Sequence, residues 1–412
     1  MINLELLRTN TAYVKKAISE KEPKFNVERL IELDITLRAV KLVVEDLRKT
    51  KNELAAQAKT GVTPELRDQS IKVGGDLKIK EAELEQIQVE FDKLYLECPN
   101  VPDQSLPSGN KEANKVVKEF GVKPKFDFEI KNHVELGKKL EWFDFEAAVK
   151  MTGARFAFYQ NEAVNVVYAL TRMMLKNNIK YGFKPFIPPY LVNEKSLEVA
   201  SNFPKFRDQV YSVTADNLYL TPTAEVNLTN LYRDHIFNSA QELPKRMTAW
   251  TSCFRREAGT YGTTEQGLIR IHQFEKVELY TICEQDQAQK EQDLMLECAE
   301  NILQQLGLHY RVSLLAGQDC SFASTKTYDI EVWMPGQGAY YEVSSISNCT
   351  DFQARRGKIR YRDNQGKTQL VYTLNGSSLA LPRLMVALME VYQQPDGSIK
   401  LPEVLLKEGL WS

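Results

Sequence analysis

Charged and aromatic side chains alternate along one segment, TSCFRREAGTYGTTEQGLIRIHQFEKVELY, in a pattern suited to binding a charged ligand. Two β-like runs flank a loop of Gly, Thr and Tyr, which predicts a long antiparallel hairpin. The two-residue period of a strand places Arg255 and Glu257 on one face of the first run. On the second run, five residues share one face: Arg270, His272, Phe274, Lys276 and Glu278. Because so polar a face is a poor core, we expect it to form the floor of a binding site.

The chemistry of this floor fits a nucleotide and an amine. Arg255 offers a forked donor for a phosphate or carboxylate, and Phe274 offers a flat ring for a base. Glu278 supplies an anion for an ammonium group. The alternative is a solvated face held by ion pairs, and the hairpin alone leaves both interpretations open. His272, taken alone, is better interpreted as a structural residue.

Two further segments carry oxygen ligands. The segment TPTAEV is expected to place Thr223 and Glu225 on one side of a strand. The segment YYEVSSISN offers Glu342 with Ser344 and Ser345, and such oxygen ligands suit Mg²⁺ carried by a nucleotide. Ser345 has the wrong parity to share a strand face with Glu342, so this pairing requires a β-bulge or a strand end.

The segment LNGSSLALPRLMVALMEVYQQ predicts a strand that runs into an amphipathic helix. Asn375, Gly376 and Ser377 are expected at the turn, and Arg383 is expected inside the helix. The earlier segment YGFKPFIPPYLV reads as a strand broken by Pro188 and Pro189. Proline cannot donate to a ladder, so this strand is expected at an edge or an interface.

The first part of the chain has the heptad spacing of a coiled coil. Steps of three and four, broken only at Lys51, separate Leu30, Leu33, Leu37, Val40, Val44, Leu47, Leu54 and Ala58. After Gly61 and Pro64, which stop the helix, the spacing resumes at Val73, Leu77, Lys80, Leu84, Ile87, Phe91 and Leu94. Two helices of about 30 residues, each roughly 45 Å long, therefore form an antiparallel hairpin arm over residues 27–97.

Between residues 38 and 59, basic residues outnumber acidic residues. The basic residues are Arg38, Lys41, Arg48, Lys49, Lys51 and Lys59, against Glu45, Asp46 and Glu53. One interpretation is a solvated coiled-coil face. The other is an arm that contacts the phosphates of a structured RNA by shape and charge. The formal net charge of −2 means that any RNA contact is local.

A segment rich in Pro, Ser, Asn and Gly follows, from Cys98 to Asn114, and it predicts a domain boundary near residue 105. The domains are then 1–105 and 106–412. The chain between Trp142 and Asn178 reads mostly as helix, and the strands described above follow it. The expected fold class is α+β, a helical arm followed by an antiparallel sheet flanked by helices.

Composition limits the class of protein. A hydrophobic fraction of 43% and a charged fraction of 26% are those of a globular domain rather than a disordered chain. No run of about 18 apolar residues and no targeting segment is visible, so we expect a cytoplasmic protein that does not span a membrane. The six cysteines form no CxxC pair and the four histidines are scattered, which argues against a disulfide framework and a structural zinc site.

Taken together, these segments resemble the class II aminoacyl-tRNA synthetases, in the bacterial form of the seryl-tRNA synthetase family. PFIPPYLV, in about 180–192, resembles motif 1, the dimer element, and the hairpin over about 248–280 resembles motif 2. The strand and helix over about 371–394 resemble motif 3. With TAEV, EVSS, SNCTDFQARR and the helical arm, the resemblance covers essentially the whole chain.

The resemblance implies an ATP site. Arg255 would bind the α-phosphate and the substrate carbonyl, and Glu257 would contact the adenine amino group. Phe274 and Arg383 would cover the two faces of the ring, and Arg383 would also reach the γ-phosphate. The implied ATP set is Arg255, Arg256, Glu257, Phe274, Glu342, Val343, Ser344, Ser345 and Arg383. Arg255 and Arg383 would be catalytic, and Glu342 and Ser345 would hold Mg²⁺.

The resemblance also implies a serine site, a tRNA and a partner subunit. The implied serine set is Thr223, Ala224, Glu225, Glu278 and Ser377, with the two glutamates reading the ammonium and hydroxyl groups. The long variable arm of tRNA(Ser) would rest on the coiled coil. A homodimer would form through Pro188 and Pro189, and no zinc would be needed. Charging of a selenocysteine tRNA is left open.

Four other classes are set aside on specific features. A ligase that loads amino acids onto a carrier protein would lack the arm. A non-enzymatic paralogue would have lost site residues, whereas Arg255, Glu278, Glu342 and Arg383 are intact. The absence of GxxxxGK[ST] excludes a P-loop ATPase, and no HIGH or KMSKS segment supports a class I synthetase.

Overall fold

The computed structural model describes residues 1–59, 61–258 and 267–410. These divide into two units, Met1–Pro99 and Asn100–Ser412. The second unit begins before the expected boundary near residue 105 because Asn100 is already bonded into it. Its backbone NH donates to the Phe322 carbonyl oxygen at 2.9 Å, and its side-chain amide donates to the Ala323 carbonyl oxygen at 2.9 Å. The proline-rich segment therefore belongs to the second unit.

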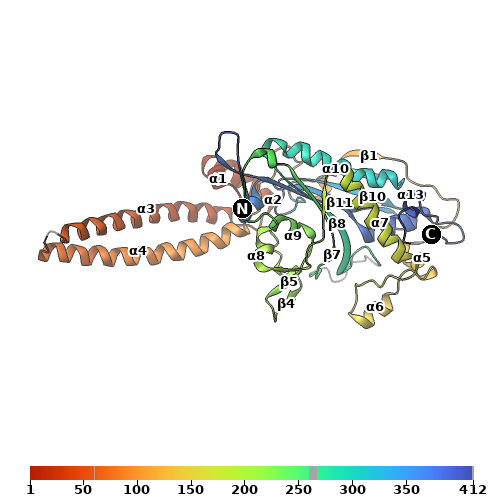
Figure 1. Ribbon diagram of the computed structural model, residues 1–412, viewed down its shortest axis with the longest axis horizontal. Coiled ribbons are helices and arrows are strands. Elements are labelled where there is room, and N and C mark those ends of the chain that lie inside the picture. The colour runs from red at the N-terminus through yellow and green to blue at the C-terminus, as the bar shows by residue number, and fades with distance from the viewer. Residues whose placement is uncertain (60, 259–266, 411–412) are drawn as a thin grey trace. The chain divides into compact units, whose positions relative to one another are not determined.

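The first unit is helical. Its helices are α1 (Leu4–Thr9), α2 (Thr11–Lys21), α3 (Val27–Ala58) and α4 (Pro64–Glu97). The last two run side by side as the predicted antiparallel hairpin (Figure 1). The hydroxyl of Thr63 caps α4 by accepting from the Leu66 NH at 3.2 Å, and Pro64 occupies the first turn, where its missing NH costs nothing.

Of the predicted seam positions of this hairpin, eight are buried and the other seven are partly buried. Its buried positions are Leu30, Leu33, Leu37, Val40, Val44, Leu54, Leu77 and Phe91. Asp34 is buried beside them, and its carboxylate forms ion pairs with Arg8 at 2.6 Å and Arg38 at 3.1 Å. Burial alone would raise the pKa of Asp34, but hydrogen bonds and charges from the two arginines lower it below the ordinary value.

The second unit is built on an eight-stranded sheet with the order β1-β9-β10-β11-β14-β8-β7-β2. The strands are β1 (Lys115–Phe120), β9 (Tyr310–Leu314), β10 (Lys326–Met334), β11 (Ala339–Asn348), β14 (Tyr372–Ala380), β8 (Gln273–Cys283), β7 (Lys245–Phe254) and β2 (Lys184–Phe186). Every neighbouring pair is antiparallel except β2 and β7. The strand next to Pro188 and Pro189 is an edge strand, as predicted. The α+β fold class is confirmed.

The remaining elements surround this sheet. The helices are α5 (His133–Lys139), α6 (Phe145–Met151), α7 (Glu162–Lys180), α8 (Glu194–Val199), α9 (Ala224–Asn230), α10 (Ala288–Gln305), α11 (Phe352–Gly357), α12 (Leu381–Tyr392) and α13 (Glu403–Leu406). Two small sheets contain β3 (Leu191–Asn193), β4 (Ser212–Val213), β5 (Leu218–Leu220), β6 (Ile236–Phe237), β12 (Arg360–Arg362) and β13 (Thr368–Leu370). Among the described helices, none has the length and apolar character needed to cross a lipid bilayer.

Three helices, α7, α10 and α12, pack against one face of the large sheet (Figure 1). Their buried side chains share one core with Val277 and Leu279 of β8. Because successive residues of a strand point to opposite faces, Lys276 and Glu278 point away from that core. The opposite face of the sheet is therefore the one that can carry a binding site.

Candidate active site

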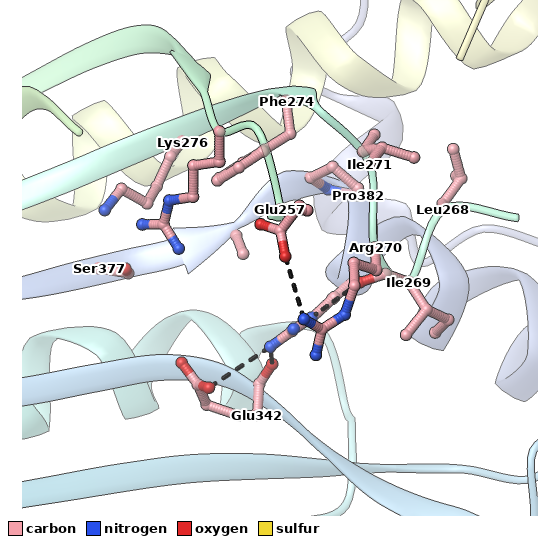
Figure 2. A pocket seen from close by; sticks show the side chains of 13 residues that line it. Glu257, Leu268, Ile269, Arg270, Ile271, Phe274, Lys276, Glu342, Ser377 and Pro382 are labelled. Atoms are coloured by element: carbon pink, nitrogen blue, oxygen red, sulfur yellow. Dashed lines mark hydrogen bonds and ion pairs between the residues drawn. The ribbon is translucent and has the colours of Figure 1, made fainter. Parts of the chain in front are cut away.

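A pocket of about 220 Å³ opens on this opposite face, between the end of β7, the start of β8 and the junction of β14 with α12. Figure 2 shows how its side chains converge from these segments. The lining residues are Arg255, Glu257, Leu268, Ile269, Arg270, Ile271, Phe274, Lys276, Glu342, Ser377, Ala380, Pro382 and Arg383. Thus the hairpin, Glu342 and the strand-to-helix segment, which lie far apart in the sequence, meet in one cavity.

The hairpin of β7 and β8 is shorter than its charge pattern indicated. The ladder ends at the pair of Phe254 with Gln273, so Arg255, Glu257 and Arg270 lie beyond it, as does His272. The two-residue period does not apply to them, and the prediction that they share strand faces is wrong. Glu257 has a φ of 48°, and its carboxylate accepts a hydrogen bond from Arg270 at 3.0 Å. The loop residues 259–266 of the motif 2 region lie outside the described residues.

Arg255 and Phe274 form one wall of the pocket. The guanidinium carbon of Arg255 lies 5.3 Å from the centre of the Phe274 ring, and its Nε donates to the Pro222 carbonyl oxygen at 3.3 Å. The Arg255 backbone NH donates to the His272 carbonyl oxygen at 2.8 Å. Arg255 therefore lines the pocket while it contacts Pro222 and Phe274. His272 supports the turn: its Nδ1 lies 2.9 Å from the Arg255 carbonyl oxygen.

Arg383 lies in the first turn of α12 and forms hydrogen bonds with Glu342 and Ile269 in the opposite wall of the pocket. Its Nη1 donates to the Glu342 carbonyl oxygen at 2.7 Å and lies 3.5 Å from the Glu342 carboxylate. Its Nε donates to the Ile269 carbonyl oxygen at 3.3 Å. Arg383 lies inside the helix, as predicted. Asn375, Gly376 and Ser377 lie within β14 rather than at the turn, which corrects that expectation.

Gly376 can lie within this strand because its position has no room for a side chain. A Cβ atom there would lie 2.8 Å from the side chain of Ile346 and 3.3 Å from its Cα, on the neighbouring strand β11. The glycine therefore permits close approach of two paired strands, and it does not serve a turn.

Three buried side chains contact one another beside the pocket: Thr223, Lys276 and Glu278, of which only Lys276 lines it. The Lys276 Nζ lies 2.5 Å from Glu278 Oε2 and donates to the Thr223 hydroxyl at 2.8 Å. That hydroxyl donates to the same glutamate oxygen at 2.8 Å. The arrangement places a carboxylate, an ammonium and a hydroxyl in mutual contact. A polar ligand that enters has to compete with these contacts or complete them.

Thr223 and Glu225 are not on a strand, contrary to the prediction. Thr223 is the N-cap of α9, where its hydroxyl accepts from the Glu225 NH at 3.3 Å, and Glu225 lies in the first turn. The Glu225 carboxylate accepts from the Gln353 side chain at 2.6 Å. Burial, and then the nearby charge of Glu278, raise the pKa of Glu225 to about 7.

A β-bulge puts Glu342 and Ser345 on the same face of β11. On β10, Ile330 pairs with Ser344 and the next residue pairs with Glu342, so Val343 has no partner on that strand. The bulge that strand parity required is confirmed. Asp329 pairs with Ser345 on the neighbouring strand β10. The Oδ1 atom of Asp329 is buried and has no hydrogen-bond partner among the described residues. Burial, and then Glu342, raise the pKa of Asp329 well above its ordinary value.

These oxygen groups fit a hard divalent cation such as Mg²⁺. Within the described ranges, no group of three or more His, Cys, Asp or Glu side chains could hold a metal ion. Glu342 and Ser345 would therefore supply only part of a coordination shell, and the rest would come from water or from a ligand's phosphates.

Several residues of the predicted site lie elsewhere. Arg256 is exposed, and its backbone NH donates to the Gln209 carbonyl oxygen at 2.9 Å. Ala224, Val343 and Ser344 are buried, and the Ser344 hydroxyl donates to the Ser377 carbonyl oxygen at 2.5 Å. The side chains of these four residues do not line the pocket, and neither do those of Thr223, Glu225, Glu278 and Ser345.

Conversely, sequence reasoning gave no role to Lys276 and Arg270, which line the pocket, or to Gln353, which holds Glu225. The strand period placed Lys276 on the correct face, and this was the available signal. For Gln353 there was none, because its partner is 128 residues away in the chain.

The sequence was compared with known proteins. Residues 1–102 match the family model of the seryl-tRNA synthetase N-terminal domain, and residues 209–392 match that of the tRNA synthetase class II core domain (G, H, P, S and T). A serine--tRNA ligase of Chlamydia abortus is 41% identical over 98% of this chain and 97% of its own length. One from Leptospira biflexa is 45% identical over 89% of this chain and 90% of its own.

A solved structure is similar to this one. It is the crystal structure of a seryl-tRNA synthetase from Pyrococcus horikoshii complexed with ATP. The TM-score is 0.93 and the sequence identity is 32%, over 99% of this chain and 98% of the other.

Proposed function

The chain belongs to the seryl-tRNA synthetase family, and from this premise we propose that it activates L-serine with ATP and transfers the seryl group to tRNA(Ser). Serine and ATP would react to seryl-adenylate and pyrophosphate, and the 3′ end of the tRNA would then accept serine. The observation that carries this proposal is one pocket, lined by Arg255, Phe274 and Arg383, whose Lys276 contacts the buried Thr223 and Glu278. We expect the reaction to take place in the cytoplasm.

ATP would bind at the outer end of the pocket. Phe274 offers a ring for the adenine, and Arg383 lies on the opposite wall. Glu257 lines the pocket, and its carboxylate, now paired with Arg270, would accept from the adenine amino group. The fork of Arg255 would contact the α-phosphate. Glu342 and Ser345 would hold Mg²⁺, which neutralises phosphate charge when it is bound with ATP.

Serine would bind at the inner end. Its ammonium group is matched by the carboxylates of Glu278 and Glu225, and its hydroxyl by the same acidic groups and Thr223. Ser377 lines the pocket between this end and the ATP end. A site of hydrogen-bonding groups disfavours alanine, because alanine would leave them unpaired.

Catalysis would rest on position and charge. The serine carboxylate attacks the α-phosphorus in line with the leaving pyrophosphate, and negative charge spreads over the phosphate oxygens. Arg255 and Arg383 are fixed by the protein before any ligand binds, so they can stabilise that charge without reorganisation. Among the described residues that line the pocket there is no histidine or cysteine, and the proposed chemistry needs no protein nucleophile.

The direct test is amino-acid-dependent ATP–pyrophosphate exchange without tRNA, with serine, threonine and alanine in parallel. We expect exchange with serine. Exchange with none of the three would favour a non-enzymatic paralogue. Exchange with another amino acid alone would contradict the serine assignment and leave the adenylation chemistry intact.

The acidity of Glu225 predicts how serine binding depends on pH. With a pKa of about 7, the ionised fraction of Glu225 rises from about a tenth at pH 6 to about nine tenths at pH 8. If the carboxylate binds the serine ammonium, the KM for serine should fall several-fold over this range. The measurement is the exchange rate against serine concentration at each pH.

The control for this prediction is Glu225→Gln, which keeps an oxygen for Gln353 but does not ionise. Its KM for serine should be higher than that of the wild type at pH 8 and nearly constant with pH. The same pH dependence in both proteins would assign the titration to another group.

The helical arm would bind the tRNA. The hairpin of α3 and α4 carries the basic residues Arg48, Lys49 and Lys51 on exposed positions. Their charge and the length of the hairpin support contact with phosphates of a structured RNA rather than with bases.

Truncation of the arm should separate the two steps of the reaction. Replacing residues 45–77 by a short Gly-Ser turn removes the tip and keeps the buried base at Leu30, Leu33 and Asp34. We expect kcat/KM for tRNA charging to fall by about 100-fold or more, because phosphate contacts supply much of RNA affinity. Serine-dependent exchange should stay at the wild-type rate. Unchanged charging would refute the proposed role of the arm.

A homodimer would form at the β2 edge of the sheet. Beside Pro188 and Pro189, Ile187 is 84% exposed and Leu191 is 43% exposed. Adjacent exposed apolar side chains at a sheet edge support an interface with a second copy of the chain.

A further inference from the structure

A buried polar cluster connects α5 to α12 behind the pocket. His133, the first residue of α5, is 1% exposed, and Glu390 of α12 is fully buried. One carboxylate oxygen of Glu390 accepts from the His133 backbone NH at 3.1 Å and from Gln337 at 2.8 Å. The other accepts from the Gly336 NH at 2.9 Å. The carboxylate is thus fully bonded and rigid.

The ring of His133 bridges this cluster to the pocket wall. Its Nδ1 lies 3.2 Å from Glu390 Oε1, and its Nε2 lies 3.2 Å from the backbone nitrogen of Leu268. An amide NH can only donate, so Nε2 has to be the unprotonated nitrogen. Nδ1 then carries the proton and donates to Glu390. This pattern assigns the neutral tautomer of the ring.

Leu268 begins the stretch 268–271, which lines the pocket (Figure 2). The carbonyl oxygen of Ile269 accepts from Arg383, and Arg270 forms an ion pair with Glu257. Arg383 and Glu390 are two helical turns apart on α12, so the same helix holds the stretch at two points. One point is direct, through Arg383, and the other passes through His133.

We propose that His133 is a positioning residue for ATP binding: its Nε2 fixes the backbone at Leu268 and thereby the wall that carries Ile269 and Arg270. His133 does not line the pocket, so it acts only through Leu268. The proposal rests on the proposed function for the identity of the nucleotide. It predicts a selective effect on ATP, because the serine end at Thr223 and Glu278 has no contact with this stretch among the contacts described above.

Two substitutions of His133 distinguish the role of Nε2 from the role of Nδ1. The carboxamide of His133→Gln reaches the position of Nε2, so its oxygen can still accept from Leu268. The carboxamide of His133→Asn reaches the position of Nδ1, so it can still donate to Glu390 but cannot reach Leu268. Both variants remove the imidazole from the same buried site and leave the backbone NH bonded to Glu390.

The readouts are the KM for ATP and for serine in exchange, and the Kd for ATP with Mg²⁺ by calorimetry on the full chain. We expect His133→Asn to raise both ATP constants about tenfold, with kcat and the KM for serine within about twofold of wild type. His133→Gln should stay within about threefold of wild type in all constants. Equal ATP constants for the two variants would overturn the proposal, as would a parallel loss for ATP and serine.

One further variant guards against a purely structural effect. His309 is also buried, but its ring contacts Phe120 and Tyr340, so His309→Asn should leave the ATP constants unchanged. If the wild type binds ATP but shows no serine-dependent exchange, the proposed function fails, and the Kd comparison still tests His133.

Discussion

Replacement of Arg255 by alanine is expected to lower the rate of seryl-adenylate formation by about 1000-fold, the effect of removing one preorganised donor to a transition-state charge. Its guanidinium is held by the Pro222 carbonyl oxygen and lies 5.3 Å from the Phe274 ring, so its fork is fixed before ATP arrives. The measurement is single-turnover adenylate formation at saturating serine and ATP, where a change reports on chemistry rather than on binding.

Two further variants test whether the effect comes from the guanidinium group of Arg255. Arg255→Lys keeps the charge but loses the planar fork, so it should recover only a small part of the lost rate. Arg172→Ala removes an exposed arginine on α7, on the helix-covered side of the sheet, and should retain the wild-type rate. A rate for Arg255→Ala within about threefold of wild type would show that the α-phosphate is bound by other groups.

The substitution Glu278→Gln is expected to reduce both serine activation and stability. Glu278 is 2% exposed and lies 2.5 Å from the Lys276 ammonium. Without its carboxylate, the buried ammonium loses its directly bonded countercharge, and breaking such a pair costs about 3–5 kcal/mol. The serine ammonium also loses its partner, so kcat/KM for serine should fall by about 1000-fold. Thermal unfolding and exchange measure the two effects.

The double variant Lys276→Met with Glu278→Gln separates stability from function. Removing both charges together avoids an unpaired buried ion, so thermal stability should return toward the wild type. Serine activation should not return, because the anion that binds serine is still missing. Recovery of exchange along with stability would mean that Glu278 acts only through the fold.

Features that depend on neighbouring residues could be predicted from the amino-acid sequence. The heptads predicted the hairpin of α3 and α4, because a helix repeats its buried positions every three or four residues. Strand parity placed Phe274, Lys276 and Glu278 on one face of β8, and it required the bulge at Val343. These patterns are local, so a short window of sequence contains them.

The points at which these local patterns stop depend on the packing of the whole domain. The ladder of β7 and β8 ends at Phe254, although the charge pattern continues to Glu257. Thr223 caps a helix in the structure, although the sequence predicted a strand. A helix cap and a short strand cannot be told apart from only a few residues.

Tertiary structure also decided which distant groups meet. Lys276 contacts Thr223 across 53 residues, and His133 reaches Leu268 across 135. Such contacts depend on how the sheet and helices pack, and no periodicity in the sequence records them. The types of residue in the site were therefore readable from the sequence, whereas the contacts that orient them were set by packing.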